Sequence, residues 1–340
     1  MEKLNILVTG STGYIGTELI KLLVKHRGVN IKYLCGHSSI GKSITLYDKK
    51  LKNKKLPKII KFNEKLLNHV DVIFSALPNG EAQKISNKLK INNTLIDLSA
   101  DFRLKNAKLY SKYYKIKHSS VKNIKKSIYG LPEIKNKKIK KFNIIGCPGC
   151  YPTSILIPLI PLLKNNLISN KGIIIDSKSG YSGAGRAVHK KYKNKNLYES
   201  LSVYGIKNHR HNSEIQQELN FESGKNVEFT FTPHLAPMFR GILSTIYVKT
   251  KKRKNIKSVI NTLKKYYKNQ IFVNISKKNS LISTNDVINT NKCLLSVCES
   301  KTKNKLIILS AIDNLIKGGG GQAIQNFNIL FNFKKNMGLK

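Results

Sequence analysis

The chain begins with a strand, a glycine-rich turn and a helix, and this combination restricts the fold more than any other feature. Residues 4–9 (LNILVT) are apolar strand formers, and a helix-period stretch covers residues 17–25. Between them lies GSTGYIG, with Gly10, Gly13 and Gly16. In this context the first glycine permits a tight turn, the second lets the backbone approach a pyrophosphate, and the third lets helix and strand pack closely. The pattern predicts a dinucleotide-binding unit with the anion at the helix N-terminus.

The next predicted strand bears on which dinucleotide is bound. Residues 30–35 are followed by GHSSIGK, which lacks the acidic residue that an NAD-specific site uses for the ribose hydroxyls. Ser38, Ser39 and Lys42 instead offer hydroxyls and a cation, which suit a 2′-phosphate, so NADP is favoured over NAD. The predicted cofactor contacts in this half of the chain are Gly10, Ser11, Thr12, Gly13, Tyr14, Ile15, Gly16, Ser38, Ser39 and Lys42.

Three more apolar stretches, residues 70–80, 94–103 and 142–150, break into small residues, as parallel strands do at the ligand-facing edge of an open sheet. Arg103, one of only six arginines, lies at such a tip. It could contact a carboxylate or phosphate, or make a surface ion pair. The predicted fold is α/β, with a Rossmann-type doubly wound nucleotide-binding domain.

The second half mixes strand patterns with a helix and predicts an α+β substrate and oligomerisation domain. Strands are expected at 243–249, 271–275 and 306–312, and a helix at 255–266. After a glycine break, the tail reads as a helix that could return to the first domain. The expected boundaries are residues 1–149 with 315–340 for the nucleotide domain, and 150–314 for the second domain.

Three stretches of the second half carry candidate binding groups. The loop DSKSGYSGAGR, 176–186, is either flexible or a backbone surface wrapped against a ligand. The HRH stretch supplies His209 and His211, and Arg240 follows in FTFTPHLAPMFRGI. The carboxylate or thiolate spacing of known zinc motifs is missing, so no metal is expected.

The net charge of +44 suggests nucleic acid at first sight, but its distribution argues against a specific site. Only 6 of the 62 basic residues are arginine, and the lysines are spread along the whole chain. Nucleic-acid sites favour clustered arginines. No apolar run is long enough to span a bilayer, and a strand pattern starts at the N-terminus without room for a signal peptide. We expect a cytoplasmic protein with reduced thiols and no membrane partner.

The pair Cys147 and Cys150 is open to three interpretations: a redox dithiol, half of a zinc site, or a nucleophile beside a bystander. Cys150 precedes Tyr-Pro-Thr, where Pro152 could open a helix and place the thiolate at its positive end, lowering the thiol pKa. A thioredoxin-type dithiol would sit at the start of a helix in a smaller domain, and a zinc ribbon needs a second CxxC. The nucleophile with a bystander is therefore favoured. A reversible disulfide between the two cysteines remains open.

Taken together, these motifs resemble the N-acetyl-gamma-glutamyl-phosphate reductases, relatives of the aspartate-semialdehyde dehydrogenases. The resemblance runs nearly end to end and rests on GSTGYIG, ALPNG, DLSADFR, YGLPE, PGCYPT, SGYSGAGR, HRH, TPHLAPMFRGI and DNLIKGGGGQA. It implies NADPH-dependent reduction of N-acetylglutamyl phosphate to the semialdehyde, a step of arginine biosynthesis. It also implies a homodimer or homotetramer built on the second domain's sheet.

The resemblance also implies roles for particular residues. Cys150 is the nucleophile that forms a thioester. His209 is the first choice for the acid/base, and His211 is the second choice or a substrate contact. The candidates for holding the substrate anions are Arg103, Arg186 and Arg240. The candidates for the nicotinamide side are Ser179, Gly180, Ser182, Gly183 and Asn314.

The chain departs from that family at Cys147, Ser154 and Pro158. Pro158 and Pro161 fall inside the helix expected after the nucleophile, where each costs about 3 kcal/mol, so a short or kinked helix is expected.

Three rival interpretations remain. The substrate could be aspartyl phosphate, because the chemistry is the same. A short-chain dehydrogenase would use Tyr-x-x-x-Lys, which matches at Tyr113/Lys117 and Tyr247/Lys251 but at about the chance rate in so lysine-rich a chain. A basic nucleic-acid-binding protein is the most remote alternative.

Overall fold

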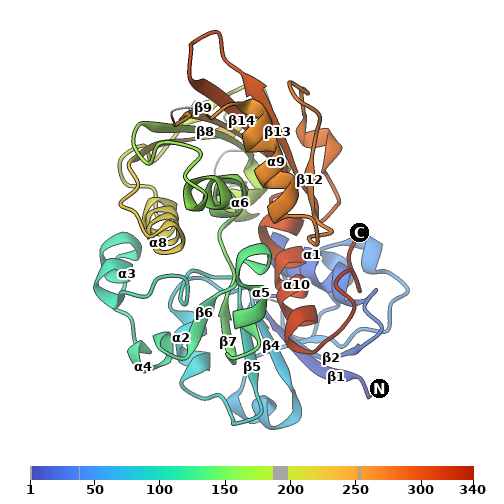
Figure 1. Cartoon of the computed structure of the whole chain (residues 1–340). Helices are drawn as coiled ribbons and strands as arrows, with labels where there is room; N and C mark the ends of the chain where they lie inside the picture. The colour runs from blue at the N-terminus through green and yellow to red at the C-terminus, as the bar shows by residue number, and fades with distance from the viewer. Residues whose placement is uncertain (1, 38, 187–197, 252–253) are drawn as a thin grey trace. The chain divides into compact units, whose positions relative to one another are not determined.

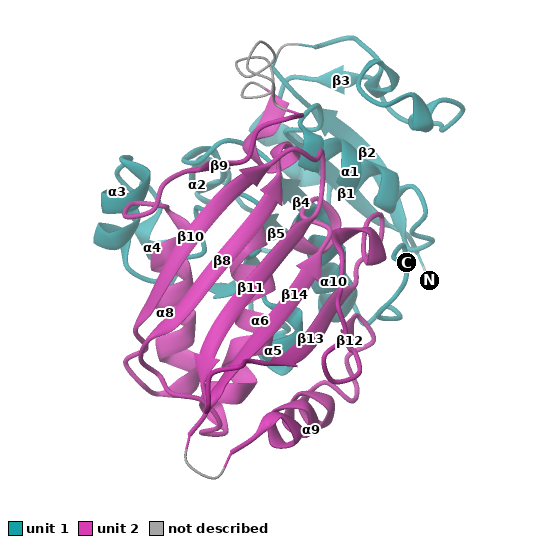
Figure 2. Cartoon of the chain, turned by 90° about the horizontal axis from the view of Figure 1, so that it is seen from above, with its two compact units in different colours: residues 1–149, 319–340 teal, residues 150–318 magenta. Residues whose placement is uncertain are grey.

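The computed structural model describes residues 2–37, 39–186, 198–251 and 254–340. It divides into two compact units, coloured separately in Figure 2. Unit 1 comprises Met1–Gly149 and Gly319–Lys340, and unit 2 comprises Cys150–Gly318.

Unit 1 is built on a seven-stranded sheet in which every pairing is parallel (Figure 1). In sheet order the strands are β3 (Ile59–Ile60), β2 (Val29–Cys35), β1 (Leu4–Thr9), β4 (Val72–Ser75), β5 (Thr94–Asp97), β7 (Ile144–Gly146) and β6 (Ser127–Tyr129). Consecutive residues Ile6, Leu7 and Val8 are all fully buried. Both faces of the sheet are therefore covered, which explains why its strands are continuous apolar runs.

The helices of unit 1 are α1 (Tyr14–Leu23), α2 (Glu81–Ser86), α3 (Ala107–Tyr114), α4 (Val121–Ile124), α5 (Pro132–Ile139) and α10 (Gly321–Leu330). The C-terminal helix α10 contacts α1, α5 and β5. Helix α1 starts earlier than the periodicity predicted. Gly13 is its N-cap, and the residues from Tyr14 to Gly16 at the end of the glycine-rich segment are already helical.

Unit 2 contains a mixed seven-stranded sheet (Figure 2). In sheet order its strands are β12 (Val273–Ile275), β13 (Cys293–Glu299), β14 (Lys305–Ile312), β11 (Ile242–Lys249), β8 (Ile173–Gly180), β10 (Phe229–Ala236) and β9 (Ser202–Val203). Its helices include α6 (Cys150–Lys164), α8 (His211–Ser223) and α9 (Ile256–Tyr266). Along β11, buried and more exposed residues alternate, because among the described residues helices pack on one face of the sheet and leave the other face uncovered. The predicted fold class, a Rossmann-type α/β domain with a second α+β domain, is confirmed.

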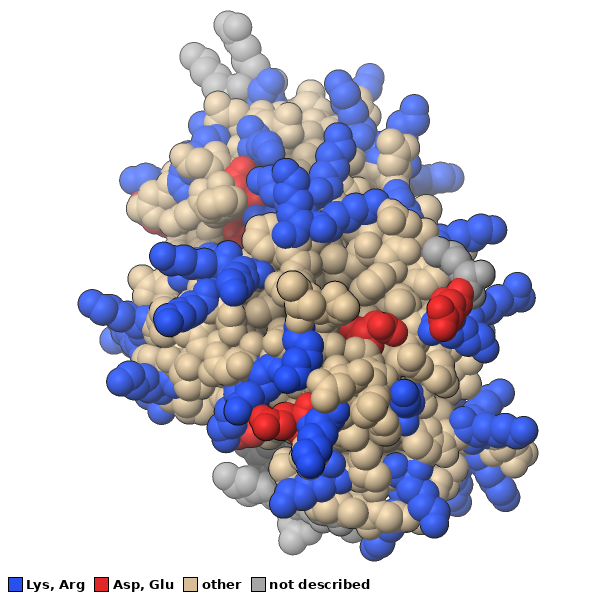
Figure 3. Space-filling model, turned by 90° about the horizontal axis from the view of Figure 1, so that it is seen from below, with Lys and Arg blue, Asp and Glu red and all other residues tan. Residues whose placement is uncertain are grey.

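Positive charge is dispersed over the face of the molecule that Figure 3 shows. Lysine and arginine side chains are scattered over the face shown in Figure 3, with uncharged surface between them. Within the described ranges, no helix has both the length and the apolar character needed to cross a membrane.

Helix α6 is not short, contrary to one of the two outcomes expected from its prolines. It spans 15 residues, with Pro158 and Pro161 inside it. Pro161 has no N–H for the carbonyl of Ile157, one turn earlier, and the Tyr267 hydroxyl donates to that carbonyl instead at 2.5 Å. All residues from Tyr151 to Leu163 are buried, so packing against α8, α9, β11 and β14 supports the helix on every side.

Removing the Tyr267 hydroxyl should therefore destabilise the protein. Tyr267→Phe leaves a buried carbonyl unsatisfied and should lower the free energy of unfolding by about 1–3 kcal/mol, measured by urea denaturation. In Pro161→Ala/Tyr267→Phe the new N–H can bond Ile157, so most of the loss should be recovered. Tyr266→Phe, at the partly exposed neighbour, is the matched control. Equal losses in the single and double variants would show that the hydroxyl does not substitute for the missing N–H.

Candidate active site

Cys150 is the first residue of α6 in unit 2, and it is partly exposed although the rest of the helix up to Leu163 is buried. A thiolate here lies at the positive end of the helix dipole, which favours the ionised form. The backbone of Gly318 packs directly against it, because a Cβ on Gly318 would lie 2.6 Å from the Cβ of Cys150. The nucleophile predicted from the sequence is therefore fixed at a helix start and in contact with the glycine turn.

Buried serines tie the first turn of α6 to the sheet of unit 2. The Ser154 hydroxyl donates to the Tyr151 carbonyl at 2.9 Å and lies 2.7 Å from the Ser244 hydroxyl of β11. Ser244 in turn lies 2.7 Å from the hydroxyl of Ser177 on β8. Ser154 thus helps to set the place of Cys150.

Aromatic side chains surround the residue that follows the nucleophile. The Tyr204 hydroxyl donates to the Tyr151 hydroxyl at 3.1 Å, and Tyr151 donates to the His234 carbonyl at 3.0 Å. The rings of His209 and His211 make edge contacts with Tyr151, with centroid distances of 5.6 and 5.9 Å. Burial raises the pKa of Tyr151, so its hydroxyl stays protonated. The sequence motifs assigned no role to either tyrosine, although Tyr151 stands in PGCYPT directly after the nucleophile.

The two candidate histidines differ in environment. The Nδ1 atom of His209 accepts the backbone N–H of His211 at 3.1 Å, so the proton of the neutral ring is on Nε2. Burial, with a smaller effect of Arg210, lowers the pKa of His209 to about 4. His211 begins α8 and is 7% exposed. At neutral pH His209 is therefore a hydrogen-bond donor held in one tautomer.

Cys147, in unit 1, is a poor nucleophile. Its side chain is 1% exposed, and burial, followed by the charge of Asp97, raises its pKa to about 12. The Asn326 amide lies 3.7 Å from its sulfur. None of the five cysteines, all of which lie in the described ranges, forms a disulfide, and Cys147 has the properties of the bystander in the predicted pair.

In unit 1 the glycine turn has the geometry of a phosphate cradle. Gly10 has φ +68°, and a Cβ there would lie 2.2 Å from the Ala76 carbonyl oxygen. A Cβ on Gly16 would lie 2.2 Å from the Gly10 carbonyl oxygen, whereas the nearest atom at Gly13 is 3.5 Å away. Gly10 and Gly16 are thus required by packing, and Gly13 leaves the helix start open. These residues fit the pyrophosphate of a dinucleotide.

The other predicted cofactor residues near this turn serve partly structural roles. Both the amide and the hydroxyl of Ser11 bond the Cys35 carbonyl, at 3.2 and 3.0 Å. The Ser39 hydroxyl pairs with Tyr47, and Lys42 is exposed. Ser38 lies outside the described residues.

A cavity of about 290 Å³ opens at the ends of β1, β2 and β4 in unit 1. Its lining includes His37, Lys61, Phe62, Leu77, Lys84 and Lys88. Lys84 and Lys88 pair with Glu81 and Glu64, at 2.7 and 3.1 Å. Lys61 makes no ion pair with any side chain that the structure describes. Lys61 directly follows β3, a strand of two residues that is too short to be predicted from sequence periodicity.

Arg103 is held by its own unit. Its Nε atom donates to the Cys147 carbonyl at 2.7 Å and its Nη2 atom to the Leu98 carbonyl at 3.0 Å. The side chain is 8% exposed. It therefore ties the loop after β5 to the segment that leads to the nucleophile.

The serine- and glycine-rich loop of unit 2 wraps against its own backbone. The amide of Gly180 donates to the Gly241 carbonyl at 2.9 Å, and the amide of Ser182 donates to the Phe239 carbonyl at 2.9 Å. A Cβ on Gly180 would lie 2.7 Å from the Arg240 amide nitrogen. Asn314 donates to the Ser182 hydroxyl at 2.9 Å and accepts the Gly241 amide at 2.7 Å. Two other predicted nicotinamide contacts differ in environment: Gly183 is exposed, whereas the Ser179 hydroxyl donates to the Gly180 carbonyl. Arg186, a predicted substrate contact in the same loop, is partly exposed.

Comparison with known proteins places the chain in a family. Residues 5–142 match the family described as "Semialdehyde dehydrogenase, NAD binding domain", and residues 150–314 match "Semialdehyde dehydrogenase, dimerisation domain". The chain is 42% identical to the N-acetyl-gamma-glutamyl-phosphate reductase of Thermoanaerobacter pseudethanolicus, covering 98% of this chain and 96% of that protein. It is 39% identical to the probable chloroplastic N-acetyl-gamma-glutamyl-phosphate reductase of Arabidopsis thaliana, covering 99% and 84%.

Solved structures share the fold. Aspartate semialdehyde dehydrogenase II of Vibrio cholerae, complexed with ASA, superposes with a TM-score of 0.74 at 16% identity, covering 98% of this chain and 99% of that chain. The Candida albicans aspartate semialdehyde dehydrogenase with NADP gives a TM-score of 0.66 at 17% identity, covering 97% and 99%. The chain is therefore an oxidoreductase of the semialdehyde dehydrogenase family, and it belongs with the N-acetyl-gamma-glutamyl-phosphate reductases, as the sequence motifs predicted.

Proposed function

We propose that the chain reduces N-acetyl-L-glutamyl 5-phosphate to N-acetyl-L-glutamate 5-semialdehyde and phosphate with NADPH, a step of arginine biosynthesis. The observation that carries this proposal is the partly exposed Cys150 at the start of the buried helix α6. The names of relatives at about 40% identity over nearly the whole chain support the choice of substrate.

The Cys150 thiolate attacks the acyl carbon, the bond to the phosphate oxygen breaks, and a thioester forms on Sγ. NADPH, when bound, supplies the hydride that converts this thioester into a thiohemiacetal. An acid/base group protonates the developing oxygen and then removes the hydroxyl proton, so that the carbon–sulfur bond breaks and the thiolate is regenerated. The glycine turn and the N-terminus of α1 would hold the dinucleotide's pyrophosphate, and Ser179, Ser182 and Asn314 remain candidates for its nicotinamide side.

His211 is the better candidate for the acid/base group. A group that exchanges protons at neutral pH needs a pKa near that pH, and the pKa of His209 is about 4. His209 also uses Nδ1 to accept the His211 amide. We assign His209 to holding the start of α8, and Arg103 and Arg186 remain candidates for the substrate's anionic groups.

The reaction is tested most simply in reverse, as phosphate-dependent oxidation of N-acetylglutamate semialdehyde with NADP. Cys150→Ala should lower kcat by about 10³-fold or more, and Cys298→Ala, at another partly exposed thiol, is the matched control. His211→Gln should lower kcat more than His209→Gln. Aspartate semialdehyde should turn over more slowly, and faster turnover of it would favour the aspartyl phosphate alternative. Full activity of Cys150→Ala would exclude the proposed mechanism.

NADP preference is supported by the absence of a carboxylate after β2 and by the cavity lined by Lys61 and His37. Lys61 is a cation without an acidic partner in the described chain, so it suits a 2′-phosphate better than Lys84 or Lys88.

Lys61→Ala removes one charged contact to the 2′-phosphate. It should therefore raise KM for NADPH by roughly tenfold and leave KM for NADH nearly unchanged. Lys42→Ala, at the lysine favoured by sequence alone, is the comparison, and steady-state kinetics with both cofactors measure the difference. If Lys42→Ala raises KM for NADPH and Lys61→Ala does not, the cavity is not the 2′-phosphate site.

A homodimer or homotetramer is supported by the face of the unit 2 sheet on which none of the described helices packs, the face turned to the viewer in Figure 2. Ile174 on β8 and Tyr247 on β11 are 47% and 38% exposed. Leu243, Ile307 and Leu309 on the same face are partly exposed. A second copy packed there would cover these side chains.

A further inference from the structure

We propose that Arg240 is a positioning residue that holds the glycine turn against Cys150 through the buried carboxylate of Asp313, instead of binding the substrate anion as its sequence motif suggested. The inference rests on the proposed function for its kinetic part only, because the arrangement of unit 2 can be tested without turnover.

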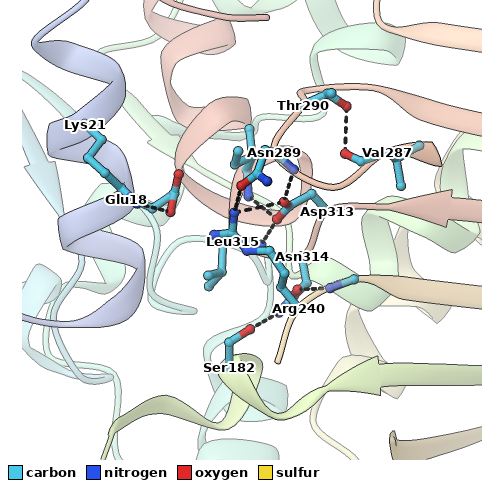
Figure 4. Close-up of polar contacts among 12 residues, drawn as sticks. Glu18, Lys21, Ser182, Arg240, Val287, Asn289, Thr290, Asp313, Asn314 and Leu315 are labelled. Carbon is cyan, nitrogen blue, oxygen red and sulfur yellow. Dashed lines mark hydrogen bonds and ion pairs between the residues drawn. The ribbon is translucent and has the colours of Figure 1, made fainter. Parts of the chain in front are cut away.

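The ion pair lies where β11 begins and its antiparallel neighbour β14 ends. Ile242 at the start of β11 is paired with Ile312 at the end of β14, so Arg240 and Asp313 are brought to the same edge of the sheet. The Nη1 atom of Arg240 lies 3.3 Å from Oδ2 of Asp313 and also bonds the side-chain oxygen of Asn289 (Figure 4). The Asp313 side chain is fully buried, and that of Arg240 is 12% exposed.

Asp313 organises the turn that follows it. Its Oδ1 atom accepts the amides of Leu315 and Ile316 at 2.9 and 3.1 Å, and its Oδ2 atom accepts the amide of Asn289 at 2.8 Å. The Asp313 carbonyl accepts the amide of Gly318 at 2.9 Å. Gly318 is the residue whose backbone packs on Cys150, so one carboxylate determines the path of the chain that touches the nucleophile.

A second link joins the same two segments. Asn314 accepts the amide of Gly241 and donates to the Ser182 hydroxyl, as Figure 4 shows. The residues next to each member of the ion pair are therefore bonded to each other and to the serine- and glycine-rich loop. Movement of Arg240 would be transmitted to this loop as well as to the turn.

The energetics favour a positioning role. A guanidinium that is already neutralised by a buried carboxylate adds little net charge for an anionic substrate. Removing the cation alone leaves an unpaired buried charge, which is far more destabilising than removing both partners. Burial is the largest influence on the Asp313 carboxyl and raises its pKa, while Arg240 and three backbone amides oppose this rise.

The test compares Arg240→Met, Asp313→Asn and the double variant. In Arg240→Met, kcat should fall by about 10²-fold, the effect of a misplaced reacting group, while KM for the semialdehyde and for phosphate should change less than about threefold. The pH profile of the rate at which iodoacetamide alkylates Cys150 should shift in the same variant. The double variant should recover at least about tenfold in kcat and most of the lost stability.

Two further variants serve as controls, and the measured outcomes distinguish a positioning role from substrate binding. Arg240→Lys retains the charge pair and should keep most of the activity, and it replaces Arg240→Met if the latter does not fold. Arg27→Met, at an exposed arginine of unit 1, is the control for loss of a positive charge. If Arg240→Met raises KM for either anionic substrate by about tenfold and the double variant does not restore it, Arg240 binds substrate and the proposal fails. If the wild-type protein has no reductase activity, the proposed function fails, and alkylation and unfolding still decide the role of the ion pair.

Discussion

The structure of unit 2 depends on placing one small thiol at the start of a helix that is buried on all sides. A helix N-terminus favours an anion only if the helix is held in place, and α6 is fixed by packing, by the Ser154–Ser244–Ser177 hydroxyls and by Tyr267. The burial that holds the helix ends at its first residue, where Cys150 is partly exposed. This combination allows the same residue to be rigid, ionisable and accessible.

The second constraint is the close approach of backbone to backbone. Gly10, Gly16, Gly180 and Gly318 each lie so near another segment that a Cβ would overlap it. In unit 1 such contacts shape a cradle for a pyrophosphate, and in unit 2 they bring the Asp313–Gly318 turn against the nucleophile. The Arg240–Asp313 ion pair holds the turn that makes the contact in unit 2, so electrostatics and packing support the same geometry.

Much of the fold was predictable because its signals are local. The apolar run, glycine turn and helix that open the chain predicted the parallel sheet, and PGCYPT predicted the placement of Cys150. Features that depend on partners distant in sequence were not predictable. Tyr267 restores a bond lost at Pro161, so the expected short helix is wrong. Lys61 lines the cavity just after a strand of only two residues, and Arg240 meets Asp313 only because of the β11–β14 register.

The central claim is that the Cys150 sulfur carries the acyl group between the two half-reactions. It is tested most directly by mixing the enzyme with N-acetylglutamyl phosphate in the absence of reduced cofactor, quenching in acid and mapping the acylated peptide by mass spectrometry. An N-acetylglutamyl adduct is expected on the peptide that contains Cys150, and it should be absent in Cys150→Ala. An adduct on another residue, or turnover without any covalent adduct, would contradict it.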